Sequence, residues 1–181
     1  TAQDKIKYQG TKFITITLCF CCFGVLCVVP ELIQLYVGKS YLYLSYWLDL
    51  WLLTTLGTHN QAISSLILAQ SDIRSITYCT ILSSIIGLLV CWFTIPLYSV
   101  GGTVIGYGMY LLIQLLFYYL YYWPQKMQIN SKSVFFRTFL PFLLIGMITA
   151  LICRFVPFLD NCNLIVAFVI KGMFFSVLYM Y

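Results

Sequence analysis

The feature that most constrains this chain is the stretch between Arg74 and Lys126, which contains no charged side chain. A membrane-spanning helix needs about 20 apolar residues, so this stretch is too long for one crossing and long enough for two. It is interrupted at residues 96–102, PLYSVGG, where proline, serine and paired glycines are typical of a turn. We therefore predict a transmembrane helical hairpin whose two ends lie on the same side of a bilayer.

The composition extends this prediction to the whole chain. Of its 181 residues, 62% are apolar and 8% are charged, whereas soluble domains have about 25% charged residues. Hydrocarbon can accommodate that many apolar side chains and a soluble core cannot. We predict an all-α integral membrane protein. The net charge of +5 does not indicate a nucleic-acid partner, because no basic cluster is interleaved with aromatic residues.

Six transmembrane helices are predicted, and they form a single transmembrane domain. Pro30 interrupts the first as a kink, which membrane helices tolerate. The chain begins at Thr1 rather than methionine and ends in an apolar run, so we expect it to be part of a larger protein. The predicted spans are residues 13–37, 44–69, 75–98, 103–123, 134–156 and 163–181.

Small residues follow one face of the hairpin's first helix and recur at the start of its second. Such residues let membrane helices approach closely, so we predict that the two stripes are packing surfaces. Aromatic residues at 41–51 and 118–123 are typical of belts at the membrane interfaces. The small residues are Thr80, Ser83 or Ser84, Gly87, Cys91 and Thr94, and then Gly102 and Gly106.

The second predicted span is the most polar. Thr54, Thr58, Gln61 and Ser65 recur at helical spacing on one face, which we expect to point into the bundle. His59 has no Cys, Asp or Glu three or four residues away. It could therefore form an interhelical hydrogen bond, contact a ligand or carry a proton, and catalysis is the least favoured role.

The few charges near the spans have alternative interpretations. Glu31 is either a carboxylate near the outer interface or a buried functional group, and Asp49 is either solvated or paired with a lysine. Arg154 lies near a helix end and can reach the headgroups. Lys171 lies near the middle of the sixth span, where an amine requires a shifted span or an aqueous cavity.

Neither a metal site nor a cofactor is predicted. Seven of the eight cysteines lie in or at the ends of apolar runs, where cysteine acts as a small hydrophobic residue. Cys19 and Cys22 have CxxC spacing but lack the flanking His, Cys or turn residues of a metal or redox motif.

The distribution of cations predicts the orientation. Seven Lys and Arg residues lie on one side of the predicted spans, whereas Lys39 and Arg154 lie on the other. By the positive-inside rule, both ends of the chain face the cytoplasm and the hairpin turn faces outward. The seven are Lys5, Lys7, Lys12, Arg74, Lys126, Lys132 and Arg137.

Three loose motifs, in this order, resemble the carboxy-terminal part of the Wzx-type polysaccharide flippases of the multidrug/oligosaccharidyl-lipid/polysaccharide exporter superfamily. They are PELIQLYVGKSYLY at the end of the first span, ILAQSDIRS at the end of the second, and IPLYSVGGTVIGYGM at the hairpin turn. The similarity covers residues 12–144. It implies that the six spans form most of one lobe of a transporter with two lobes, whose amino-terminal lobe is absent from this chain.

The resemblance also implies a function. Such proteins flip polyprenyl-pyrophosphate-linked oligosaccharides across the bacterial cytoplasmic membrane by alternating access, for O-antigen (lipopolysaccharide) or capsule biosynthesis. Their partners are membrane lipid, the lipid-linked oligosaccharide and, potentially, other membrane proteins of polysaccharide assembly. By this resemblance Arg154 and Lys171 are candidate pyrophosphate ligands, and the candidate cavity lining is Thr54, Thr58, His59 and Gln61.

Two alternatives are kept. A cation-coupled multidrug exporter of the same superfamily needs acidic cavity residues, and only Glu31 and Asp49 lie near the spans. A membrane enzyme acting on polyprenyl-linked glycans, such as a polymerase, usually needs a sizeable polar loop with convergent catalytic groups. The longest predicted internal loop, 124–133, contains no His, Asp, Glu or Cys. We therefore expect a transporter and not an enzyme.

Overall fold

The computed structural model describes residues 2–60, 73–126, 128, 130–154 and 164–180. Within these ranges the chain is almost entirely helical and contains no strand, which supports the predicted all-helical class. Among the described residues, four helices are long and apolar enough to cross a membrane. They are Tyr8–Leu26, Ile73–Tyr98, Val100–Lys126 and Ser131–Arg154.

The other two predicted spans are not found at full length among the described residues. The span at 44–69 is described only to residue 60, and the rest of it lies outside the described ranges. The span at 163–181 corresponds to α9, Leu164–Met180, which is apolar but shorter than the four long helices. The structure therefore supports a helical membrane protein without confirming six crossings.

The helices form two compact units. Unit 1 comprises Thr1–Thr15 and Gly57–Phe139, and unit 2 comprises Ile16–Leu56 and Leu140–Tyr181. Each unit has a buried apolar cluster of its own: Tyr122, Trp123 and Val134 in unit 1, and Val29, Ile33 and Leu52 in unit 2.

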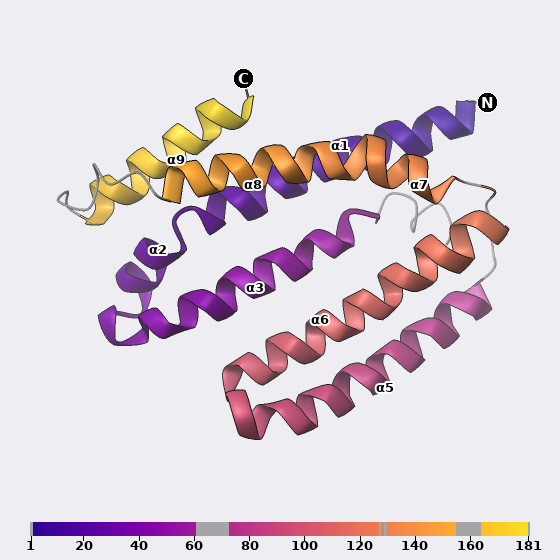
Figure 1. The fold of residues 1–181 in the computed structure, drawn as a ribbon, viewed down its shortest axis with the longest axis horizontal. Helices are drawn as coiled ribbons and strands as arrows, with labels where there is room; N and C mark the ends of the chain where they lie inside the picture. The colour runs from indigo at the N-terminus through magenta and orange to yellow at the C-terminus, as the bar shows by residue number, and fades with distance from the viewer. Residues whose placement is uncertain (1, 61–72, 127, 129, 155–163, 181) are drawn as a thin grey trace. The chain divides into compact units, whose positions relative to one another are not determined.

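The charge-free stretch in unit 1 forms the predicted hairpin. Helices α5 (Ile73–Tyr98) and α6 (Val100–Leu116) lie antiparallel and side by side (Figure 1). The turn is much tighter than the predicted 96–102, because only Ser99 lies between the helices, with a φ of 52°. Pro96 lies inside the last turn of α5, and the nitrogen of Ser99 still donates to the carbonyl of Ile95 at 2.8 Å.

The paired glycines serve packing rather than the turn itself. A β-carbon added at Gly102 would lie 2.5 Å from the backbone nitrogen of Ile95, and one at Gly106 would lie 2.7 Å from the carbonyl oxygen of Gly87. The Thr94 hydroxyl donates to the carbonyl of Gly102 at 3.0 Å. The predicted small-residue surfaces on the two helices therefore meet, as expected.

The second aromatic stretch differs from its prediction. Helix α6 continues as a wide π-helix, η3 (Phe117–Lys126), so residues 124–126 of the predicted loop are helical. Tyr122 and Trp123 are 3% and 0% exposed, since they pack against Val134. These two residues belong to the core of unit 1 and do not form part of an exposed belt.

The last long helix begins earlier than predicted. Its first turns are α7 (Ser131–Val134) and a π-helix, η4 (Phe135–Phe139), followed by α8 (Leu140–Arg154). The start is fixed by Asn130, whose side-chain oxygen accepts a hydrogen bond from the backbone nitrogen of Ser133 at 3.2 Å. This is an N-cap, which satisfies one of the donors that a helix start leaves without a partner.

In unit 2, the first predicted span is two helices rather than one kinked helix. Helix α1 (Ala2–Leu26) ends before a turn at residues 27–28, and α2 (Val29–Tyr36) follows. Pro30 lies in the first turn of α2. A proline there has no helical hydrogen bond to lose, so it begins a helix instead of bending one.

The remaining core of unit 2 depends on close contacts among α1, α8 and α9. A β-carbon on Gly146 of α8 would lie 2.3 Å from the ring of Phe23 of α1. Phe175 of α9 is 1% exposed and packs on Phe20 of α1, with ring centroids 5.8 Å apart, and the Tyr179 hydroxyl of α9 donates to the carbonyl of Ile16 of α1 at 3.2 Å. These contacts hold α9 in the unit and so position Lys171.

The hairpin contact predicts a specific effect of substitution. Gly102→Ala places a methyl group against the backbone of α5, which cannot move aside without opening the hairpin. We expect the free energy of unfolding to fall by about 1–3 kcal/mol, the usual penalty of overpacking. Thermal unfolding of the purified protein in detergent measures the change.

Gly172→Ala is the matched control, because a β-carbon at Gly172 meets nothing within 4 Å. It should leave the unfolding temperature unchanged or raise it slightly, since alanine favours helix over glycine. Equal destabilisation by the two substitutions would contradict the assigned hairpin contact.

Candidate functional site

The most buried charges of the described chain form an ion pair in unit 2. Glu31 lies in the first turn of α2, and Lys171 lies in the middle of α9. The Lys171 Nζ donates to the Glu31 Oε1 at 2.5 Å, and the two side chains are 7% and 12% exposed. The position of Glu31 also suits a carboxylate, because the start of a helix carries a partial positive charge.

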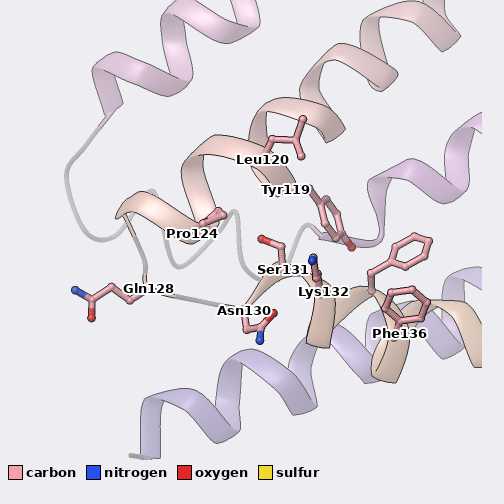
Figure 2. Close-up of a pocket in the computed structure, with 9 residues that line it drawn as sticks. Tyr119, Leu120, Pro124, Gln128, Asn130, Ser131, Lys132 and Phe136 are labelled. Atoms are coloured by element: carbon pink, nitrogen blue, oxygen red, sulfur yellow. The ribbon is translucent and has the colours of Figure 1, made fainter.

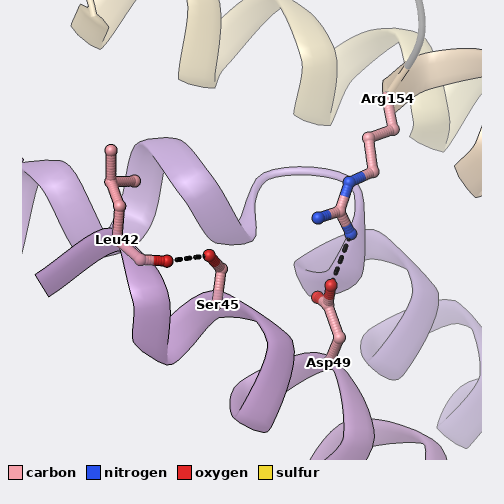
Figure 3. Close-up of polar contacts among 4 residues, drawn as sticks. All are labelled: Leu42, Ser45, Asp49 and Arg154. Carbon is pink, nitrogen blue, oxygen red and sulfur yellow. Dashed lines mark hydrogen bonds and ion pairs between the residues drawn. The ribbon is translucent and has the colours of Figure 1, made fainter.

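A second pair lies in the same unit. Arg154, the last residue of α8, donates from Nη1 to Oδ2 of Asp49 at 2.7 Å (Figure 3). Asp49 lies on α3 (Ser45–Thr55), one turn after Ser45, whose hydroxyl donates to the carbonyl of Leu42. The Arg154 and Asp49 side chains are 24% and 18% exposed, so this pair is less buried than the first.

Each carboxylate retains one oxygen without a hydrogen bond. Within the described part of the chain, Oε2 of Glu31 and Oδ1 of Asp49 are buried and have no partner. Buried polar atoms normally find partners, and those that do not are often found at functional sites. Each carboxylate is thus held by a single cation, and its second oxygen can accept a further donor.

His59 forms a separate site in unit 1. It lies in a 3-10 turn, η2 (Leu56–Asn60), and is 1% exposed. Its Nε2 lies 2.6 Å from the hydroxyl of Tyr119, and its ring stacks on Phe139 with centroids 4.0 Å apart. The geometry corresponds to the interhelical hydrogen bond among the alternatives considered for this residue.

The predicted polar stripe is preserved only in part. Helix α3 ends at Thr55, and the tighter turns of η2 follow, so the spacing expected for an α-helix does not apply to Thr58. The Thr54 hydroxyl donates to the carbonyl of Trp51 at 2.8 Å, and Thr58 is partly exposed. Gln61 and Ser65 lie outside the described residues.

Sequence reasoning selected Lys171 and Arg154 but did not identify their partners. It placed Glu31 near the outer interface or in a functional site, and it considered a lysine partner for Asp49, whereas the structure pairs Asp49 with Arg154. The usable signal was the presence of two acids and two bases in otherwise apolar segments. Ionised groups within a membrane tend to pair with one another, which limits the pairings to two.

No metal centre is indicated within the described residues, where no three His, Cys, Asp or Glu side chains cluster. Among the described cysteines none forms a disulfide, and Cys19, Cys22, Cys27 and Cys153 are buried.

Comparison with known proteins adds no relative. A scan against protein-family models and searches of the curated proteins and of the solved structures find no match. The functional argument therefore rests on the chemistry and geometry of the two ion pairs.

The buried pair predicts how stability responds to neutralisation. Glu31→Gln leaves the Lys171 amine buried without its counter-charge. Such a change typically lowers the free energy of unfolding by about 3–5 kcal/mol. Glu31→Gln combined with Lys171→Met removes both charges and should restore most of that loss. Chemical unfolding of the three proteins in detergent measures the difference.

The corresponding variants of the more exposed pair are the comparison. They are Asp49→Asn alone and Asp49→Asn combined with Arg154→Met. Asp49→Asn alone should lower the free energy of unfolding less than Glu31→Gln does, because water screens the Arg154 charge that remains. If Glu31→Gln is as stable as the parent protein, the Glu31–Lys171 pair is not buried as described.

Proposed function

We propose that this chain belongs to a transporter that flips polyprenyl-pyrophosphate-linked oligosaccharide repeat units across a bacterial cytoplasmic membrane. The repeat units would serve O-antigen or capsule biosynthesis. The observation that carries the proposal is the buried Lys171–Glu31 pair within apolar helices. Intramembrane charges are costly and commonly mark the path of a polar substrate, so this pair is the best candidate for such a path.

The proposed mechanism is an exchange of partners. In the absence of substrate, Glu31 neutralises Lys171. A pyrophosphate carries the same sign of charge as the carboxylate, so it can replace Glu31 without leaving the amine unpaired. The exchange avoids the penalty of burying a lone charge, which makes it compatible with a substrate that binds and then leaves.

Arg154 would provide a second phosphate contact. Its guanidinium can form two parallel hydrogen bonds with a phosphate, but the bond to Asp49 uses only one of its donors. Alternating access then has a physical basis, because each cation is neutralised by a carboxylate in one state and by substrate in the other. Thr54 of α3, in the same unit, remains a proposed contact for the sugar hydroxyls.

The proposed orientation follows from the cation distribution, with both ends of the chain in the cytoplasm. The turn at Ser99 then faces outward. In this orientation Arg154 lies toward the outer face, and a substrate would leave its phosphate contacts in the outward direction.

The first test is genetic. Deleting the gene should abolish the surface polysaccharide, while lipid-linked repeat units accumulate on the cytoplasmic side of the membrane. Access of externally added glycan-binding reagents to spheroplasts, before and after lysis, locates those units. If repeat units reach the outer leaflet and only the polymer is missing, the protein is a polymerase and the proposal is wrong.

The second test separates charge from stability. The Glu31→Gln/Lys171→Met variant lacks the exchangeable cation and does not leave either member of this pair as a lone charge. We expect it to fold and to transport at less than about a tenth of the parental rate, since one charge-assisted contact to phosphate is lost. Flipping of fluorescent polyprenyl-pyrophosphate oligosaccharide in proteoliposomes measures the rate.

Lys126→Ala is the control for a general loss of positive charge, because Lys126 lies at the end of η3 in unit 1 and is not part of the two ion pairs described above. It should transport normally. Unchanged transport by the neutral double variant would assign the ion pair a purely structural role.

A cation-coupled multidrug exporter is the second candidate. It is favoured by the buried, unpartnered oxygens of Glu31 and Asp49, which a proton or a metal cation could bind. The gene deletion distinguishes the two functions: loss of an exporter would increase drug susceptibility and leave the surface polysaccharide intact.

A further inference from the structure

A pocket is lined by residues of unit 1, and none of the four residues of the ion pairs is among them. It has a volume of about 740 Å³, within the range of about 300–1,000 Å³ that ligand sites usually have. It is formed where η3 ends and α7 begins (Figure 2). The function proposed for the cations of unit 2 does not use it.

The walls of the pocket are apolar and open to the surface. Tyr119, Leu120, Pro124 and Phe136 line it, and Leu120 and Phe136 are 71% and 60% exposed. Apolar side chains exposed to this extent on a membrane helix are suited to contact with hydrocarbon rather than with water. The walls therefore fit an alkyl chain.

Beside these apolar walls the pocket has polar and basic lining. Ser131 and Lys132 line it from the first turn of α7, and no carboxylate lies among the described residues that line it. Lys132 is exposed, and none of the described acidic residues pairs with it. The Ser131 hydroxyl oxygen is buried and has no hydrogen-bond partner within the described ranges.

The backbone adds to this positive potential. Ser131–Arg154 is one long helix, and its first N–H groups have no partners within the helix. Asn130 caps only the nitrogen of Ser133. A helix start favours anions, particularly phosphate. The amine, the hydroxyl and the helix start thus provide donors for a phosphate beside an apolar wall.

We propose that this pocket binds an anionic glycerophospholipid of the surrounding bilayer. The phosphate contacts Lys132 and Ser131, and the first part of an acyl chain lies against Leu120 and Phe136. Basic pockets between membrane helices on the cytoplasmic side are known to take such headgroups, and anionic lipid is the abundant amphiphile of that surface.

Tyr119 connects the lipid site to the core of unit 1. Its ring lines the pocket, while its hydroxyl bonds to the buried His59 and its ring packs edge-on to Phe135, with centroids 6.1 Å apart. A lipid seated in the pocket therefore stabilises the contact between η3 and the segment that begins at Ser131.

Native mass spectrometry of the delipidated whole protein tests this site, using phosphatidylglycerol and phosphatidylcholine with the same acyl chains. We expect the first bound phosphatidylglycerol to be held more tightly than phosphatidylcholine. Lys132→Ala should weaken the binding of phosphatidylglycerol about fivefold, which is the effect of one lysine near an anionic lipid. It should leave the binding of phosphatidylcholine unchanged. Lys132→Glu should abolish the preference.

Lys126→Ala is the matched control, because Lys126 lies at the same end of unit 1 but does not line the pocket. It should bind as the parent protein does. Equal binding of the two lipids, or an equal loss in Lys126→Ala and Lys132→Ala, would overturn the site. Binding of polyprenyl pyrophosphate that phosphatidylglycerol cannot displace would also overturn it, by assigning the pocket to substrate. Circular dichroism of each variant verifies that a loss of binding is not a loss of fold.

Discussion

The cost of placing a charge in hydrocarbon determines how this protein is organised. A lone ionised group there is several kcal/mol less stable than in water, so a chain with so few charges must pair them or place them at helix ends. Unit 2 pairs them: Glu31 with Lys171, and Asp49 with Arg154. Each pair joins two helices that are distant in sequence, so the requirement for neutrality also fixes which helices pack together.

Unit 1 meets the same solvent with a stretch that has no charged side chain between Arg74, near the start of α5, and Lys126, at the end of η3. Helices α5 and α6 are held together by contact between small residues, where Gly87, Gly102 and Gly106 let the backbones approach. Lipid tails are as apolar as leucine, so close packing replaces the hydrophobic effect as the source of association. The hairpin thereby serves as a scaffold that is held by packing alone. The proposed phosphate contacts, Lys171 and Arg154, lie in unit 2, and the proposed lipid contact lies at the start of α7.

The sequence predicted the elements better than it predicted their details. The hairpin followed from the absence of charge, and the contact between its small-residue surfaces is confirmed. Pro30 was misinterpreted as a kink within one span, and the turn predicted within residues 96–102 is tighter than expected, because a proline tolerated at the start or end of a helix has the same local signature as a break. Tyr122 and Trp123 suggested an interfacial belt, but aromatic residues also fill cores, and only packing against Val134 distinguishes the two.

For the candidate site, the sequence indicated individual residues but not which of them form pairs. Lys171 and Arg154 could be selected from sequence because a cation in an apolar segment is conspicuous, but their partners lie 140 and 105 positions away. Local pattern has no information at that separation, and the pairing depends on how α2, α3, α8 and α9 pack.

The two kinds of cation in this chain differ in a way that relates to their proposed ligands. Lys171 is buried and already neutralised by Glu31, so any anion it binds must displace a carboxylate, and binding is reversible because the carboxylate can return. Lys132 is exposed and has no acidic partner among the described residues, so an anion there displaces only water. The first arrangement suits a substrate that is passed on. The second suits a lipid that stays and stabilises the packing around Tyr119.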